Sequence, residues 1–349
     1  MKMMCIRLIG INELSVEEID PPVPGDSEVL VKVKSAAICG TDIRMLRNGN
    51  AKNESGRSLI LGHEVAGVIV QTGSRVVNYR TGMRVAIAPN MGCGVCRFCV
   101  SGNTHLCKDY KAFGINIDGG FAEYMLVPEA AVHQGNLVEI SDSVSFDEAA
   151  VNEPFSCTYN GFSQYRVDPG DRVLIVGAGP IGLMHAKLAK MAGASKVMIH
   201  DLSEERLRQC VDIDPSFIAL SEPGLNQKII EQTGGEGLDV CVTACPAPSA
   251  QAAAFEWMGM GGRINFFGGL PKDKEIVPIN TNAIHYKQLT VTGSTRSSIS
   301  QFRKTLKFIS DGIVSVKDLI TARYRIEDAH EAFGMAADAK GIKTLFFFD

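Results

Sequence analysis

The sequence of 349 residues lacks the features that would place it in a membrane or on nucleic acid. No apolar run approaches the roughly 20 residues of a membrane-spanning helix, and the most apolar stretch, 173–184, is interrupted by three glycines and a proline. The N-terminal residues contain no long apolar core, so we expect no secretory signal peptide. The net charge of −4 leaves no basic excess for nucleic acid or anionic lipid.

What remains is the composition of a globular protein, with 45% hydrophobic and 21% charged residues. A chain of this length is too long for one ordinary core and predicts two domains. Ten cysteines without a secretion signal indicate a reducing, cytoplasmic environment. In such an environment cysteines are buried, catalytic or metal-bound.

Four of the cysteines form a compact cluster, with two, two and seven residues between successive members: Cys93, Cys96, Cys99 and Cys107. Turns of the C-x₂-C type bring sulfurs onto one ion, and a tetrahedral zinc takes four thiolates at roughly 2.3 Å. Gly92, Gly94 and Gly102 give the backbone the freedom that these tight turns need.

Two other interpretations of the cluster fit less well. Disulfides rarely span two-residue gaps, and the chain carries no sign of secretion. Iron–sulfur clusters use other cysteine spacings. The sequence therefore predicts a closed structural zinc, which leaves no open position for a substrate, so the chemistry must lie elsewhere.

Further metal-ligand side chains occur in three short motifs. Cys39 is followed by Thr41, a pattern that would also suit a buried cysteine before a helix. His63 and Glu64 precede a strand-like run, although such a pair is often a surface pair. Glu153 lies among apolar and small residues, where a carboxylate needs a partner such as a cation.

A second domain is indicated by a short strand, 172–176, that runs into Gly177-Ala178-Gly179-Pro180-Ile181-Gly182. A helical pattern over 183–192 and a strand over 196–200 follow. This context matches the dinucleotide-binding fingerprint, in which glycines admit a pyrophosphate to a helix N-terminus. Further strands, 238–243, 262–268 and 289–294, alternate with helical segments, which predicts a doubly wound parallel sheet in an α/β protein.

The acidic residue of that fingerprint is Asp201, at the end of the second strand and nineteen residues after Gly182. A carboxylate there accepts hydrogen bonds from the adenosine ribose hydroxyls and repels a 2′-phosphate. Arg206, on the next predicted helix, could compensate for that repulsion. The sequence favours NAD as the cofactor.

These motifs together resemble the zinc-containing medium-chain alcohol dehydrogenases. The pattern Gly62-His63-Glu64, with Gly67, Gly73 and Val76, is similar to that family's signature, as are the cysteine lobe 93–107 and the stretch 118–124. The resemblance covers essentially the whole chain. Glu64 and the pair Glu153-Pro154 are most similar to the sorbitol (polyol) dehydrogenase branch, whose zinc architecture L-threonine 3-dehydrogenases share.

The resemblance implies three segments. Residues 1–155 would form a GroES-like, partly open β-barrel catalytic domain with the zinc lobe at 93–107. Residues 156–294 would form a Rossmann domain that binds NAD, and 295–349 would return to the catalytic domain. Relatives associate through the last strand of the Rossmann domain, here about 288–294, so we expect a homo-oligomer, a dimer or a tetramer.

The resemblance also implies two zinc ions per chain and a set of site residues. Cys39, His63 and Glu153 would hold the catalytic zinc, with Glu64 binding it directly or exchanging with water. Zinc lowers the pKa of an alcohol that binds in the fourth position. Thr41 would begin proton removal. Arg296 would match an arginine that sorbitol dehydrogenases place near the zinc and the substrate, or it would pair with an acidic residue.

One departure from the family affects the proton path. Many relatives have a histidine three residues after the hydroxyl at the Thr41 position, whereas this chain has Arg44, which cannot act as a base. Thr41 can still hydrogen-bond the reacting oxygen.

We therefore expect an NAD-dependent dehydrogenase that transfers a hydride from a secondary alcohol of a polyol. Its binding partner would be a small-molecule alcohol and not nucleic acid or a membrane. The alternative within the family is oxidation of L-threonine. A zinc-stabilised binding protein is the alternative from another class, and the absence of a basic excess argues against it.

Overall fold

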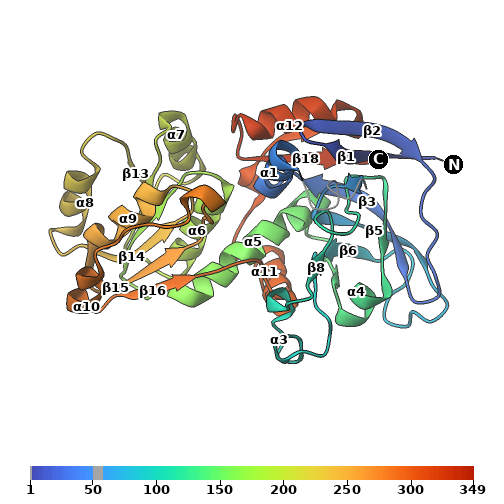
Figure 1. Ribbon diagram of the computed structural model, residues 1–349, viewed down its shortest axis with the longest axis horizontal. Coiled ribbons are helices and arrows are strands. Elements are labelled where there is room, and N and C mark those ends of the chain that lie inside the picture. Colours follow the sequence, from blue (N-terminus) through green and yellow to red (C-terminus); the bar gives the residue numbers. More distant parts are fainter. Residues whose placement is uncertain (1, 50–57) are drawn as a thin grey trace. The chain divides into compact units, whose positions relative to one another are not determined.

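The computed structural model describes residues 2–49 and 58–349. The chain divides into two compact units, one comprising residues 1–156 and 296–349 and the other residues 157–295 (Figure 1). Among the described residues, no helix combines the length and apolar character needed to cross a membrane.

The first unit is built around strand β3 (Val29–Ala37), which pairs antiparallel with β5 (Glu64–Thr72), β9 (Tyr124–Val127) and β18 (Lys343–Phe347). The sheet order is β10 (Leu137–Glu139), β6 (Arg84–Ile87), β5, β3, β18 and β17 (Ile320–Tyr324). A smaller sheet has the order β2 (Glu13–Ile19), β1 (Met3–Gly10) and β4 (Leu59–Ile60). Alternate valines of β3 are fully buried, as its period-two pattern predicts: Val29, Val31 and Val33.

Helices and short pairings complete this unit. The α-helices are α1 (Gly40–Asn48), α3 (Arg97–Val100), α4 (Glu129–Gln134), the first part of α5 (Phe146–Tyr165), α11 (Ile299–Ser310) and α12 (Ala329–Ala337). The 3₁₀ turns are η1 (Thr104–Leu106), η3 (Lys317–Leu319) and η4 (Ile326–Asp328). Strands β7 (Asn90–Met91) and β8 (Lys111–Ala112) pair at the base of the cysteine lobe.

The second unit contains a parallel sheet in the order β13 (Ile218–Leu220), β12 (Lys196–His200), β11 (Arg172–Val176), β14 (Leu238–Thr243), β15 (Met258–Phe266) and β16 (Thr290–Gly293). Helices α6 (Pro180–Met191), α7 (Glu204–Ile213), α9 (Pro248–Trp257) and α10 (Thr281–Lys287) pack against its strands, and α8 (Leu225–Thr233) follows β13 (Figure 1). The middle strands are apolar along their length because helices cover such sheets on both faces. This order confirms the predicted doubly wound sheet.

One boundary differs from the sequence prediction. The expected helix over 251–258 ends at Trp257, and β15 begins at Met258 rather than at Gly262. Gly259, Gly261 and Gly262 follow directly, and glycine lowers the stability of a helix. Met258 instead pairs with Leu238 of β14.

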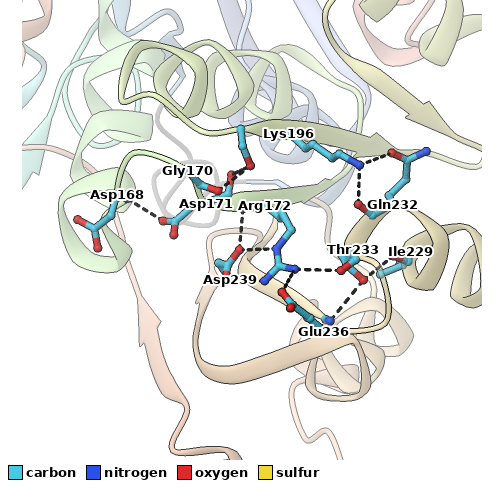
Figure 2. Close-up of polar contacts among 12 residues, drawn as sticks. Asp168, Gly170, Asp171, Arg172, Lys196, Ile229, Gln232, Thr233, Glu236 and Asp239 are labelled. Carbon is cyan, nitrogen blue, oxygen red and sulfur yellow. Dashed lines mark hydrogen bonds and ion pairs between the residues drawn. The ribbon is translucent and has the colours of Figure 1, made fainter.

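Polar contacts join the start of the parallel strands to helix α8 (Figure 2). The Arg172 Nε lies 2.8 Å from Asp239 Oδ2, and its Nη1 donates to the carbonyl of Thr233 and to Glu236. Although burial alone would raise it, the pKa of Asp239 is lowered by hydrogen bonds from Arg172. Lys196 Nζ donates to the carbonyl of Gln232 at 2.7 Å.

A buried ion pair links the last strand of the chain to β5. Lys343 Nζ lies 2.6 Å from Glu64 Oε1, and the two side chains are 4% and 0% exposed. The ammonium also donates to the carbonyl of Ile38 at 2.9 Å. The register that pairs Leu345 with Ala37 brings these groups together. Charged groups this deeply buried are stable only when paired.

Replacing Lys343 by methionine should lower the free energy of unfolding by about 3–5 kcal/mol, because Glu64 would keep a buried charge without its partner. Chemical denaturation at pH 8, with matched zinc content, measures this loss. Lys343→Arg, which retains the charge, should lose less. The double variant Lys343→Met/Glu64→Gln should recover most of the loss, since both charges are then absent. A single Lys343→Met variant as stable as wild type would contradict the assignment.

Candidate active site and cofactor loop

The chain turns sharply at Gly62, directly before His63 and Glu64. Gly62 has φ +92°, and a Cβ there would lie 2.4 Å from the ring of Phe121. At Gly119, a Cβ would lie 2.1 Å from the Gly62 carbonyl oxygen. Glycine is therefore required at both positions, and the turn places Glu64 opposite Ala37 at the end of β3.

Three of the predicted ligands meet next to this turn. One ligand atom each from Cys39, His63 and Glu64 lies within 4.8 Å of the other two. Cys39 stands immediately before α1, Glu64 is the first residue of β5, and His63 directly precedes that strand. A thiolate, an imidazole and a carboxylate at this spacing form a donor set that suits zinc.

Asp42 lies next to the histidine, with a buried carboxylate oxygen facing the ring. Its side chain is fully buried, and Oδ2 accepts a hydrogen bond from the backbone N–H of Cys39 at 2.9 Å. Oδ1 faces His63 Nδ1 at 3.6 Å, which leaves Nε2 of the ring for a metal. Although burial alone would lower it, the pKa of His63 is raised by the negative charges of Asp42, Cys39 and Glu153.

The electrostatics of Glu64 also fit a cation. Burial raises the pKa of its carboxyl to about 7, against the opposing charge of Lys343. Lys343 occupies Oε1, whereas Oε2 is buried and has no hydrogen-bond partner among the described residues. An unpartnered carboxylate oxygen in the cluster is the atom that a metal ion would satisfy.

Glu153 lies close to the cluster, in helix α5. It is 6% exposed, and its charge influences the pKa values of His63, Glu64 and Lys343. Among the described residues, the group within 4.8 Å contains Glu64 rather than Glu153.

Thr41 and Arg44 lie in the first turns of α1, next to the cluster. Arg44 Nη2 is 3.5 Å from Thr41 Oγ1, so the guanidinium faces the hydroxyl. The threonine is partly exposed and the arginine is exposed.

The four cysteines of the lobe also converge. Their sulfurs, from Cys93, Cys96, Cys99 and Cys107, lie within 4.8 Å of one another. A Cβ at Gly92 would lie 2.3 Å from the Cys99 sulfur, so glycine is needed there.

The acidities of these thiols reflect their crowding. Backbone N–H groups of Val95 and Cys96 lower the pKa of Cys93 to about 7. Burial and hydrogen bonds with the other three thiols raise the pKa of Cys99 to about 12. Four adjacent sulfurs become thiolates together only when a cation neutralises them, and tetrahedral zinc suits this donor set.

Arg296 contacts the cysteine lobe. Its Nη1 donates to the carbonyl of His105 at 2.9 Å, and its guanidinium carbon lies 3.8 Å from the centre of the Tyr110 ring. Its backbone is left-handed, with φ +56°. Arg296 thus joins the segment before α11 to the turn that carries Cys107.

In the second unit, the glycines of the dinucleotide motif have distinct roles. Gly177 has φ +114°, and a Cβ at Gly182 would lie 1.8 Å from the Gly177 carbonyl oxygen. At Gly179, the nearest atom to a Cβ would be Arg206 Nη1 at 3.9 Å, so the loop is open there. Helix α6 begins directly after it, at Pro180 followed by Ile181. The open loop before a helix N-terminus fits a pyrophosphate.

Asp201 holds this loop to the next one. Its Oδ2 accepts a hydrogen bond from the N–H of Ala178 at 2.8 Å, and its Oδ1 accepts one from Ser203 at 2.9 Å. Arg206 Nη1 lies 3.8 Å from the same Oδ2. The Asp201 carboxylate therefore stabilises the glycine loop through a hydrogen bond and also lies near the guanidinium of Arg206.

Sequence reasoning missed the roles of Lys343 and Asp42. Nothing in the sequence around Lys343 distinguishes it from a surface lysine, because its partners lie about 280–305 residues away. The one local signal is that Lys343 begins an otherwise largely apolar strand, Thr344-Leu345-Phe346-Phe347. The spacing of Asp42, three residues after Cys39, could have indicated its role. At this position a carboxylate can accept a hydrogen bond from the backbone N–H of the residue that precedes a helix.

Comparison with known proteins agrees with this arrangement. Residues 25–137 match the family model of the alcohol dehydrogenase GroES-like domain, and residues 180–311 match that of the zinc-binding dehydrogenases. Together these matches cover most of both units.

Full-length relatives are similar as well. Sorbitol dehydrogenase of Bacillus subtilis is 32% identical, over 94% of this chain and 92% of its own length. L-Threonine 3-dehydrogenase of Vibrio parahaemolyticus is 33% identical, over 94% of each chain.

Two solved structures, each 28% identical, superpose over nearly the whole chain. A zinc-binding dehydrogenase from Sinorhizobium meliloti bound to NADP covers 100% of both chains with a TM-score of 0.88. An alcohol dehydrogenase from Escherichia coli complexed with NADH covers 99% of both with a TM-score of 0.89. These similarities confirm the resemblance and the fold class predicted from the sequence, and the chain belongs to the zinc-containing medium-chain alcohol dehydrogenase family.

Proposed function

We propose that this oxidoreductase transfers a hydride from a secondary hydroxyl of a polyol to NAD⁺. The observation that carries the proposal is the buried group of Cys39, His63 and Glu64 in a chain that also has a dinucleotide loop. A zinc ion held there supplies Lewis-acid chemistry and lowers the pKa of an alcohol. In the proposed reaction the carbon that bears the hydroxyl would give a hydride to the nicotinamide ring while the hydroxyl gives up its proton, and the alcohol would become a ketone.

The surrounding residues prepare the site for this reaction. Asp42 keeps His63 in one orientation, and Lys343 balances the charge of Glu64. Glu153 would be the third zinc ligand, as the family pattern implies. Glu64 would either bind the zinc directly or exchange with water, and its unpartnered carboxylate oxygen is available for this. Thr41 accepts the proton of the substrate hydroxyl in a hydrogen bond and begins its removal. Arg44 cannot carry that proton onward, so solvent receives it directly.

Sorbitol-like substrates are favoured by the two glutamates and by Arg296, whose five N–H donors can reach hydroxyl groups. Arg296 Nη1 donates to the carbonyl of His105 in the cysteine lobe. L-Threonine is the alternative substrate, because relatives that act on it have similar overall identity. Chains are proposed to associate through the edge strand β16, where Val291 is 37% exposed.

Elemental analysis of active protein should find two zinc ions per chain, one in each cluster. Cys93→Ser should lose one zinc and lower the thermal midpoint, because structural zinc binding is coupled to folding. Cys39→Ser should abolish turnover while the circular dichroism spectrum stays unchanged. Fully active protein with a single zinc would contradict the two-site proposal.

The cofactor preference is expected to be NAD⁺ over NADP⁺ in kcat/KM, since Asp201 repels a 2′-phosphate. Initial rates with each cofactor at saturating alcohol measure the ratio. Asp201→Gly should reduce it, and Arg206→Gln should increase it by removing the cation that would attract the phosphate. A wild-type preference for NADP⁺ would overturn the assignment.

For the substrate, kcat/KM should be higher for sorbitol or xylitol than for L-threonine when NADH formation is followed at 340 nm. Arg296→Ala should lower kcat/KM for the polyol by about tenfold or more, the value of a hydrogen bond to a charged group. A preference for threonine would refute the polyol substrate. Unchanged polyol kinetics in Arg296→Ala would instead remove this arginine from the site.

A further inference from the structure

Arg44 is an exposed cation beside the hydroxyl that is proposed to hold the substrate. Its Nη2 lies 3.5 Å from Thr41 Oγ1. Among residues 2–49 and 58–349, no ion pair involves Arg44. The guanidinium is therefore free of a carboxylate partner within the described part of the protein.

The nearest acidic and basic groups of α1 are engaged elsewhere. Asp42 is buried and faces the opposite way, with Oδ2 on the N–H of Cys39 and Oδ1 toward His63. Arg47, three residues after Arg44, donates to the carbonyl of Ala337. The two arginines of this helix thus differ, since Arg47 contacts the end of α12 and Arg44 faces Thr41.

A guanidinium at this place has a limited set of uses. It stays charged at all physiological pH values, so it cannot accept a proton from Thr41. It binds carboxylates well, through two parallel N–H···O hydrogen bonds. The positive end of α1 lies within the same first turns and adds to the attraction for an anion.

We propose that Arg44 binds a carboxylate of the substrate, which makes a sugar acid, rather than a neutral polyol, the preferred substrate. This inference rests on the proposed function, in which Thr41 hydrogen-bonds the reacting hydroxyl. The path from that hydroxyl through Thr41, across the Arg44 guanidinium and on to a carboxylate contains three hydrogen bonds and spans at most roughly 12 Å. The hydroxyl and the carboxylate of a six-carbon sugar acid fit within that length.

The reaction itself is unchanged by this contact. The secondary alcohol loses a hydride to NAD⁺ and a proton to solvent, and the products are a ketone, NADH and a proton. The carboxylate takes no part in the bond changes and only fixes which hydroxyl faces Thr41.

Matched alcohols test the inference. D-Gluconate and L-gulonate each differ from sorbitol only in the oxidation of one terminal carbon, and D- and L-galactonate have the same relation to galactitol. In the wild-type, zinc-loaded enzyme, at least one acid should exceed its alditol in kcat/KM by about tenfold. Arg44→Gln should lower kcat/KM for that acid by about tenfold to a hundredfold, mainly through KM. The loss for the alditol should be smaller, because it has no carboxylate for the guanidinium to bind.

Three controls sharpen the result. Arg47→Gln removes a charge from the same helix and should leave the preference for the acid intact. Arg44→Lys should keep part of the preference for the acid that Arg44→Gln loses, because the lysine retains the positive charge but cannot form the bidentate hydrogen bonds of a guanidinium. Higher ionic strength should weaken the acid's kcat/KM and leave the alditol's unchanged.

Several outcomes would overturn the inference. They are a wild-type preference for the alditols, equal losses for acid and alditol in Arg44→Gln, or a loss that appears only as a higher KM for NAD⁺. Calorimetric titration with the acids and alditols decides the matter without turnover: the acid should bind more tightly in wild type than in Arg44→Gln. If no alcohol yields NADH, the proposed function fails, while this binding difference still supports or refutes the role of Arg44.

Discussion

A buried ion pair between Lys343 and Glu64 is the contact on which the candidate active site depends. It joins β18 to β5, whose first residue is Glu64 and which directly follows His63. The same ammonium holds the carbonyl of Ile38, directly before Cys39. One cation therefore secures both segments that meet in the site, and it leaves one oxygen of Glu64 available.

Around this pair, the backbone geometry of two glycines also positions the metal-ligand side chains. The turn at Gly62 and the close approach of Gly119 leave no room for side chains, so the two ligands at the start of β5 have fixed positions. Asp42 then orients the histidine from the first turn of α1. The donor set is therefore positioned by three segments: the turn at Gly62, the first turn of α1 and strand β18. None of these is a long loop.

Much of this arrangement could be predicted from local sequence. The strands at 172–176, 196–200 and 238–243 occur where apolar, β-branched runs lie between turn residues. The pattern around Gly62-His63-Glu64 and the cysteine lobe 93–107 carry the family resemblance, because their spacing reflects turn geometry. Residues that act through distant partners could not be found in this way. Lys343 and the contact of Arg296 with the cysteine lobe depend on tertiary pairing across many residues.

The position of Lys343 also has a consequence for how the protein is made. Lys343 lies 279 residues after Glu64, and the whole second unit is synthesised between them. While the ribosome is adding that unit, Glu64 has no ammonium to balance it. We expect the nascent first unit to keep this carboxylate hydrated or protonated over that interval. The ion pair can form only once β18 has been made and pairs with β3.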